Sequence, residues 1–128
     1  DEYLKRLGRY CSASVRELPD RPDDGRATER ESEELLSAMN GYVILADIGG
    51  KPLTSEQLAE AIDRAYLTAD KVQFVIGGSR GVTEEVKKRA DLAVSFGRVT
   101  YPHRLMRLIA AEQLYRAFTI TAGTAYHK

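Results

Sequence analysis

The sequence contains a single cysteine, Cys11, no tryptophan and two histidines among its 128 residues. One cysteine cannot form an internal disulfide, which favours a reducing compartment, and we therefore expect a cytoplasmic protein. One cysteine and two histidines also form a poor set of metal ligands, so no metal site is expected. No apolar run approaches the roughly 18 residues that a membrane-spanning helix needs. No segment has the pattern of a secretory signal peptide.

Neither positive nor negative charge is in excess, because 19 Lys and Arg side chains balance 19 Asp and Glu side chains. This balance argues against indiscriminate binding to nucleic acids. The two halves of the chain differ, since residues 1–70 hold 9 basic against 15 acidic side chains, and residues 71–128 hold 10 against 4. A basic C-terminal half indicates that one end of the molecule meets a polyanion; a solvated surface on both halves is the plainer alternative.

Helical and strand patterns alternate along a chain whose length suits one domain. The strand candidate 42–46 is a continuous apolar run, which is typical of a strand buried on both faces of a parallel sheet, and 72–76 is a second candidate of this buried type. We therefore expect an α/β fold with a mainly parallel sheet. Residues 119–128 show little helical pattern. The expected strands are 42–46, 72–76 and 92–96, and the expected helices are 27–39, one from Thr54 with a capping box to Gln57, one from Thr83, and one from Pro102 to about Phe118.

Three loops follow the expected strands, at residues 47–52, 77–81 and 96–101. Ligands of open α/β sheets bind at the carboxyl ends of the strands, so these loops are candidates for a small-molecule site. The run Gly77-Gly78-Ser79-Arg80-Gly81 lacks the spacing of a phosphate-binding P-loop and of a dinucleotide-binding fingerprint. Glycines that serve only tight turns are the alternative reading of these loops.

Several motifs in a fixed order resemble the RlmH family of SPOUT methyltransferases. The resemblance covers nearly all of the chain and is densest after Val72. A loop of acidic-x-x-Gly-Lys type, residues 47–51, agrees with it. The four segments that carry the resemblance are Phe74-Val75-Ile76-Gly77-Gly78-Ser79, Ser95-Phe96-Gly97-Arg98-Val99-Thr100-Tyr101-Pro102-His103, Glu112-Gln113-Leu114-Tyr115-Arg116-Ala117-Phe118 and the terminal Tyr126-His127-Lys128.

The resemblance implies one SPOUT methyltransferase domain over residues 1–128, with a C-terminal trefoil knot that departs from the usual absence of knots. It also implies a homodimer that uses S-adenosyl-L-methionine to methylate N3 of a pseudouridine in large-subunit (23S) rRNA, on the assembled ribosome. The family opens with a strand that is missing here. Because the chain opens in what reads as the end of an amphipathic helix, we expect that its N-terminal part is incomplete.

By resemblance, the cofactor pocket takes residues from the ends of all three expected strands. Apolar side chains and backbone groups would hold the adenine and methionine portions of the cofactor. Gly78 is included for its effect on the backbone path, and a purely structural role is an equal alternative. The cofactor-binding residues expected on this basis are Ala46, Gly77, Gly78, Phe96, Gly97, Arg98, Val99, Thr100 and Tyr101.

Three residues near the C-terminus are expected to act on the RNA. His127 is a candidate base or hydrogen-bonding partner of the uracil-like ring, because the imide N3 must lose a proton. Tyr126 is a candidate for stacking on the flipped base. Arg116 is expected to stabilise the developing anion or hold a phosphate. The alternatives are a solvated tail for His127, packing of the tail for Tyr126, and an i,i+4 ion pair with Glu112 for Arg116.

Other polar residues carry weaker indications. Asp47 is a candidate acid in the site or a turn residue, and His103 would order the cofactor loop or begin the last helix. Arg104 and Arg107 would contact RNA phosphates or simply face water, and the basic run 87–89 is read as a surface feature. The apolar residues of the helix at 103–118 are expected in the core or in a dimer interface.

Two other functions are compatible with the same residues. One is a non-catalytic module that binds RNA or the ribosome, which would have no need of S-adenosylmethionine. The other is a SPOUT methyltransferase directed at tRNA, which the neutral net charge and the lack of an appended RNA-binding domain disfavour.

Overall fold

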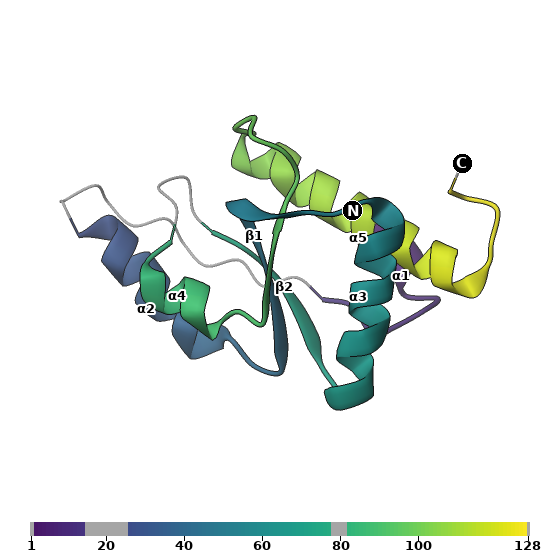
Figure 1. Cartoon of the computed structure of the whole chain (residues 1–128), viewed down its shortest axis with the longest axis horizontal. Helices are drawn as coiled ribbons and strands as arrows, with labels where there is room; N and C mark the ends of the chain where they lie inside the picture. The colour runs from purple at the N-terminus through teal and green to yellow at the C-terminus, as the bar shows by residue number, and fades with distance from the viewer. Residues whose placement is uncertain (1, 15–25, 78–81, 128) are drawn as a thin grey trace.

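The computed structural model describes residues 2–14, 26–77 and 82–127. Within these residues the chain forms helices and strands that alternate through most of the sequence (Figure 1). The elements are α1 (Glu2–Leu7), α2 (Ala27–Ala38), β1 (Tyr42–Pro52), α3 (Ser55–Thr68), β2 (Val72–Ile76), α4 (Glu84–Arg89), β3 (Leu92–Ser95) and α5 (His103–Ala122).

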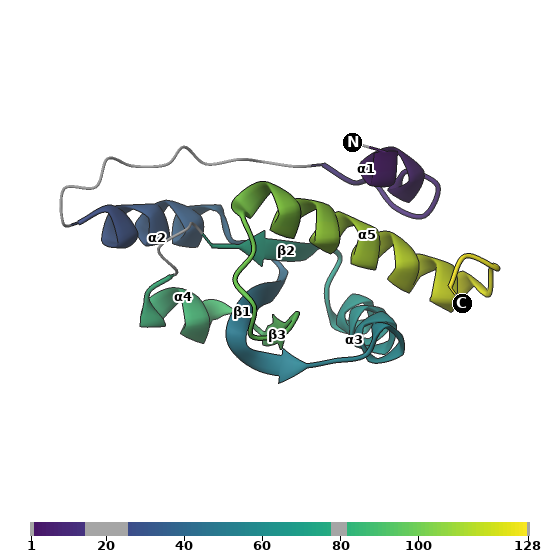
Figure 2. The ribbon, with the colours of Figure 1, turned by 90° about the horizontal axis from the view of Figure 1, so that it is seen from above.

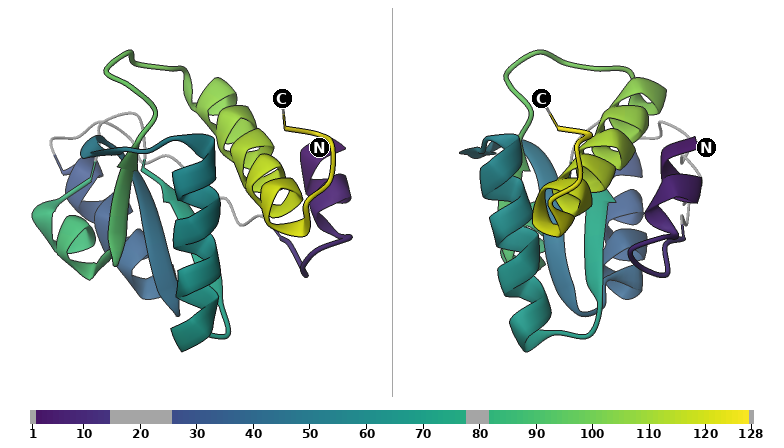
Figure 3. Two further views of the ribbon diagram at one scale, coloured as in Figure 1. Left: turned by 45° about the vertical axis from the view of Figure 1, so that its right-hand side comes forward. Right: turned by 90° about the vertical axis from the view of Figure 1, so that its right-hand side faces the viewer.

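The sheet has the strand order β2-β1-β3, and both neighbours of β1 run parallel to it. Helices α2 and α4 cover one face of the sheet, while α3 and α5 lie on the other side (Figures 1 and 3). Val43, Ile44 and Leu45 of the central strand are fully buried, so both faces of β1 are covered. The expected α/β class with a parallel sheet is therefore confirmed.

The main core lies between the sheet and helix α3, where Ile44 and Val94 pack with Leu58 and Ile62. Ala117 extends this core to α5. Burial of apolar side chains contributes about 25 cal/mol per Å² of area removed from water, so this layer stabilises the fold. The core fixes α3 and α5 against the strands, and these two helices carry the groups described below.

Strand β1 is longer than its apolar run predicts. Residues 47–52, expected as a loop, belong to the strand, because β1 bulges after Ala46 and then pairs with β3 again. Val94 faces Ala46 before the bulge and Lys51 after it. The expectation of a loop was wrong because pairing with a distant strand leaves no mark on the local sequence pattern.

Helix α5 also extends beyond its expected end near Phe118. Thr119 is fully buried, and its hydroxyl donates to the Arg116 carbonyl at 2.6 Å. The helix ends one turn later at Gly123, whose φ of 73° is the left-handed conformation typical of a helix C-cap. Residues 119–122, expected to lie outside the helix, are therefore its last turn.

Helix α1 packs on the outer side of α5 (Figure 2). Tyr3 lies 6.1 Å from the Tyr115 ring, and Tyr10, just after the helix, stacks on Phe118 at 5.9 Å. No helix in the described part of the chain is long and apolar enough to cross a membrane. The trefoil knot implied by the family resemblance remains a prediction.

Candidate functional site

The carboxyl ends of β2 and β3 lie on either side of Ala46, the last residue of β1 before its bulge. Ala46 of β1 pairs with Ile76 of β2 on one side and with Val94 of β3 on the other. Gly77 directly follows β2, and Phe96 directly follows β3. The Phe96 ring reaches across to Phe74 of β2, with 6.0 Å between ring centroids. The expected cofactor residues Ala46, Gly77 and Phe96 therefore come from the same edge.

A cavity of about 320 Å³ lies beside this edge, between the ends of β1 and β3, the first turn of α3 and the middle of α5. Leu53, Leu58 and Phe96 supply apolar lining, while Ser55 and Gln113 supply polar groups. The Ser55 hydroxyl donates to the Gln113 side-chain oxygen at 2.8 Å. Ligand pockets of proteins start at roughly 300 Å³ and combine apolar walls with a few polar groups, as this cavity does.

The cavity includes two of the expected cofactor residues, Phe96 and Gly97. Gly97 has a φ of +105°, and an added Cβ would meet no atom within 4 Å, so its backbone faces open space. Ala46, Gly77 and the segment 98–101 do not line this cavity, and Arg98, Val99 and Thr100 are exposed. Gly78 lies outside the described residues.

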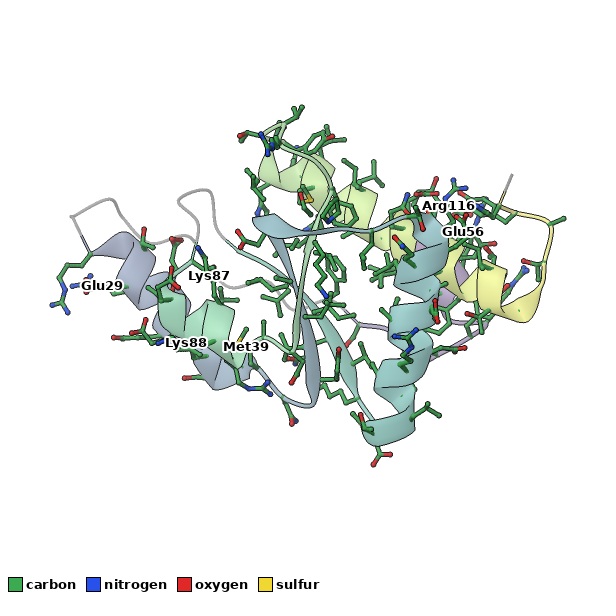
Figure 4. All side chains as sticks on the ribbon, in the orientation of Figure 1. Glu29, Met39, Glu56, Lys87, Lys88 and Arg116 are labelled. Atoms are coloured by element: carbon green, nitrogen blue, oxygen red, sulfur yellow. The ribbon has the colours of Figure 1, made fainter. Side chains whose placement is uncertain are left out.

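The three expected catalytic residues form one cluster, which we call the tail cluster: Arg116, Tyr126 and His127 together with Glu112 and Glu56. Arg116 donates to Glu112 through Nε at 2.9 Å and Nη2 at 2.6 Å, and its Nη1 lies 3.0 Å from Nδ1 of His127. The Tyr126 hydroxyl donates to Glu112 Oε1 at 3.3 Å. His127 Nε2 lies 3.1 Å from Glu56 Oε1, and Figure 4 shows Glu56 of α3 beside Arg116 of α5.

The tail cluster is joined to the cavity by hydrogen bonds. The Gln113 amide, which lines the cavity, donates to Glu112 Oε2 at 3.0 Å. Glu112 in turn accepts from Arg116, which contacts His127. His127 in turn contacts Glu56, which directly follows the cavity residue Ser55. This series of contacts therefore begins and ends in the first turn of α3. None of Arg116, Tyr126 and His127 lines the cavity itself.

The charges of the tail cluster follow from these contacts. The hydrogen bond that Arg116 donates to Glu112, and then the negative charge of Glu112, raise the pKa of Arg116, which stays a cation. A hydrogen bond with Tyr3 is the main cause that raises the pKa of Tyr126 to about 12, and burial and the Glu112 carboxylate add to it. Tyr126 is therefore a neutral donor near neutral pH. Its ring is packed within the protein, edge-on to Tyr115 at 4.7 Å and 5.0 Å from the Arg116 guanidinium.

Helix α3 positions the Glu56 side of this cluster. Thr54 accepts from the Gln57 backbone N–H at 3.1 Å, and the Gln57 side chain accepts from the Thr54 N–H at 2.9 Å. These two bonds are the expected capping box, which is confirmed. The box fixes the first turn of α3, where Ser55 faces the cavity and Glu56 faces His127.

The remaining candidates lie apart from the tail cluster. Asp47 stands in the bulge of β1, and exposed His103 is the first residue of α5. Lys87 and Lys88 lie on α4, on the opposite side of the molecule from Arg116 (Figure 4). Arg89, the last residue of that basic run, donates to the Gly41 carbonyl at 2.9 Å and pairs with Asp91.

Sequence reasoning missed the residues that connect the two parts of the site. Glu56 and Ser55 look like an ordinary first turn of a helix, and only the capping box marks where that turn begins. Glu112 was considered only as an i,i+4 ion-pair partner of Arg116, a pair that the structure contains, and nothing in the sequence around Gln113 indicates contact with a cavity. The contacts join residues about 60 positions apart, as in the Ser55–Gln113 pair at a separation of 58.

Comparison with known proteins gives consistent results. The family described as "Predicted SPOUT methyltransferase" matches residues 1–127. Three bacterial proteins named ribosomal RNA large subunit methyltransferase H are similar to the chain. The one from Clostridium novyi is 43% identical, with 100% of this chain and 87% of the relative covered. The one from Desulfitobacterium hafniense is 44% identical over 99% and 86%, and that from Caldicellulosiruptor saccharolyticus is 38% identical over 100% and 88%.

The match extends over almost every residue of the chain and includes each motif on which the resemblance was based. The expectation from those motifs is confirmed: this chain belongs to the SPOUT methyltransferases, in the family of ribosomal RNA large subunit methyltransferase H.

Proposed function

We propose that this protein transfers a methyl group from S-adenosyl-L-methionine to N3 of a pseudouridine in large-subunit rRNA, within the assembled ribosome in the cytoplasm. The relatives' name, ribosomal RNA large subunit methyltransferase H, supports the substrate class. The observation that carries the proposal is the hydrogen-bonded connection between a small-molecule cavity and the tail cluster.

The lining of the cavity suits the chemistry of the cofactor. Leu53, Leu58 and Phe96 offer apolar contacts, and the backbone at Gly97 is open to an approaching ligand. Ser55 and Gln113 offer hydrogen-bonding groups. S-adenosylmethionine, when bound, supplies an electrophilic methyl group on a sulfonium sulfur. The expected contacts of Ala46, Gly77, Gly78 and residues 98–101 remain part of the proposal, because they come from the same edge of the sheet.

The tail cluster is proposed to act on the RNA. The imide N3 carries a proton near neutral pH and must lose it, so an acceptor at the reacting atom assists the transfer. His127 is the proposed acceptor, and Arg116, a cation bound to Glu112, is proposed to hold the anion that forms. Tyr126 is proposed to contact the base. In this structure its ring packs against Tyr115, so stacking on a base requires the ring to move.

The protein is further proposed to work as a homodimer. Leu105 and Leu108 of α5 are 42% and 45% exposed, and Val99 in the preceding loop is 65% exposed. Arg98 and Arg104, which precede Val99 and Leu105 in the sequence, are exposed, and their charge suits contact with RNA phosphates. A second copy of the chain would cover the apolar residues and leave these charges at its edge.

The deciding experiment incubates the protein with labelled S-adenosylmethionine and ribosomes that lack the modification, followed by mapping of the labelled nucleotide. The expected result is label on one pseudouridine of the large-subunit rRNA. Purified tRNA in a parallel reaction should stay unlabelled. Label on tRNA, or cofactor binding without transfer to any RNA, would overturn the proposal. No binding of the cofactor by calorimetry would favour a non-catalytic module.

A further inference from the structure

Both ring nitrogens of His127 have a partner, and the two partners differ in kind. Nδ1 lies 3.0 Å from Nη1 of Arg116, and Nε2 lies 3.1 Å from Oε1 of Glu56. A guanidinium group can only donate hydrogen bonds, so Nδ1 must accept in this contact. The ring proton of the neutral imidazole therefore sits on Nε2, where it points to the Glu56 carboxylate. The partners of His127 thus determine its tautomer.

Glu56 is well placed to hold this proton. It stands in the first turn of α3, between Thr54 and Gln57, the two residues of the capping box that fixes the helix start. The other carboxylate of the tail cluster, Glu112, already accepts from Arg116, Tyr126 and Gln113. Among the described residues, the charged and titratable groups that contact His127 or its partner Arg116 are Glu56 from α3, Arg116 and Glu112 from α5, and Tyr126 from the tail.

The pair of Nη1 on Arg116 and Nδ1 on His127 also matches the proposed substrate. A uracil-like imide presents an N3–H donor beside carbonyl acceptors. In this structure the donor Nη1 of Arg116 and the acceptor Nδ1 of His127 are hydrogen-bonded to each other. An imide placed between them would give each a new partner, the carbonyl oxygen for Arg116 and N3–H for His127. Nε2 would keep its contact with Glu56 throughout.

We propose that Glu56 is a positioning residue for the methyl transfer, one that holds the Nε2–H of His127 and so makes Nδ1 the atom that accepts the N3 proton. This inference rests on the proposed function. The N3–H bond breaks, and its proton forms a bond to Nδ1. The electron pair left on N3 forms the bond to the methyl carbon, while the carbon–sulfur bond breaks and its electrons stay on sulfur. Glu56 then faces an imidazolium, whose charge it stabilises.

The tautomer can be measured without any substrate. The chain has two histidines, so a nitrogen NMR spectrum of the labelled full chain needs only His103→Gln to identify the His127 signals. Because Arg116 selects the same tautomer, the measurement uses Arg116→Met, which leaves Gln113 and Tyr126 bonded to Glu112. In this variant we expect Nε2 of neutral His127 to stay pyrrole-like and Nδ1 pyridine-like.

Adding a second substitution isolates the contribution of Glu56. Glu56→Ala should bring both nitrogens to intermediate shifts, because the tautomers then interconvert freely. Glu56→Gln should retain the Nε2–H tautomer, because its amide oxygen still accepts. Glu60→Ala is the matched control, since Glu60 lies one turn further along α3 and pairs with Arg64. An Nδ1–H tautomer in Arg116→Met alone, or unchanged shifts after Glu56→Ala, would overturn the assignment.

Kinetics on ribosomes, with Arg116 in place, give an independent test. Glu56→Ala should lower kcat by roughly tenfold or more, a part of the factor that acid–base assistance supplies. Glu56→Gln should recover most of the loss, and Glu60→Ala should match the wild type. Cofactor affinity by calorimetry should stay within about twofold in all three. A weakened cofactor affinity would instead place Glu56 in the cavity. If the wild type itself never methylates ribosomes, the proposed function fails, whatever the tautomer proves to be.

Discussion

Gly50 occupies the point where β1 rejoins β3 after its bulge. A Cβ built on Gly50 would lie 2.6 Å from the Ala93 carbonyl carbon and 2.7 Å from the Val94 nitrogen, both of them backbone atoms that cannot move aside. We expect Gly50→Ala to lower the free energy of unfolding by about 1–3 kcal/mol, the usual range for overpacking. Urea unfolding followed by circular dichroism measures this. Gly49→Ala is the matched control, since its Cβ would meet only Asp47 Oδ2 at 3.6 Å; equal losses would contradict the argument.

Tyr126 makes the tail sensitive to alkaline pH. Its pKa is raised from 10 to about 12, chiefly by the hydrogen bond with Tyr3, so the folded protein holds this proton more tightly than the unfolded chain. The resulting stability is complete below the ordinary pKa and is lost as pH rises from about 10 to about 12. We expect Tyr126→Phe to lower the urea midpoint at about pH 8, and its difference from the wild type to shrink as pH rises through this window.

The control for the alkaline titration is Tyr101→Phe, because Tyr101 precedes α5 and lies outside the tail cluster. Its urea midpoint should run parallel to that of the wild type over the same pH range. A constant difference between Tyr126→Phe and the wild type up to about pH 12 would mean that the Tyr126 hydroxyl has no special partner in the folded state.

Helix α3 depends on its first turn for both stability and position. Thr54→Ala removes the side-chain acceptor of the capping box, and we expect a loss of about 1 kcal/mol in the free energy of unfolding. Because Thr54 lines the cavity and the cavity residue Ser55 belongs to the same turn, cofactor affinity should weaken as well. Thr68→Ala at the other end of α3 removes a longer bond, 3.4 Å to the Ala65 carbonyl, and should leave cofactor affinity unchanged. Calorimetry on both variants distinguishes them, and equal cofactor affinities would contradict a positional role for the box.

Helices and strands were predictable where the sequence pattern of the segment itself determines them. The apolar run at 42–46 marked the central strand, because a strand buried on both faces must be apolar, and 72–76, apolar except for Gln73, marked a second strand. The second half of β1 was not predictable, since Lys51 and Pro52 are in the strand only through pairing with β3. The last turn of α5 was missed because its support is the burial of Thr119, which a local pattern does not reveal.

At the scale of the whole molecule, motifs and contacts gave different information. The family motifs identified Arg116, Tyr126 and His127 as a set, and the structure brings these three together. Their link to the cavity runs through Glu112, Gln113 and Ser55, and it depends on how α3 packs against α5. No periodic pattern in the sequence reveals how one helix packs against another that is distant in the chain. The sequence therefore predicted residues that lie together in the structure, and it did not predict how they are connected to the cavity.

The exposed apolar residues of α5 are expected to lie in the interface of the proposed dimer. Leu105 and Leu108 are spaced i,i+3 and so share one side of the helix, and both are over 40% exposed. A charge there would have to be buried in the dimer, so Leu108→Glu should shift the protein from dimer to monomer at micromolar concentration. Sedimentation velocity measures the shift. Leu67→Glu is the matched control, because Leu67 is 83% exposed near the end of α3, and this variant should remain dimeric. A Leu108→Glu protein that sediments as a dimer would place the interface elsewhere, and a monomeric wild type would rule out the dimer itself.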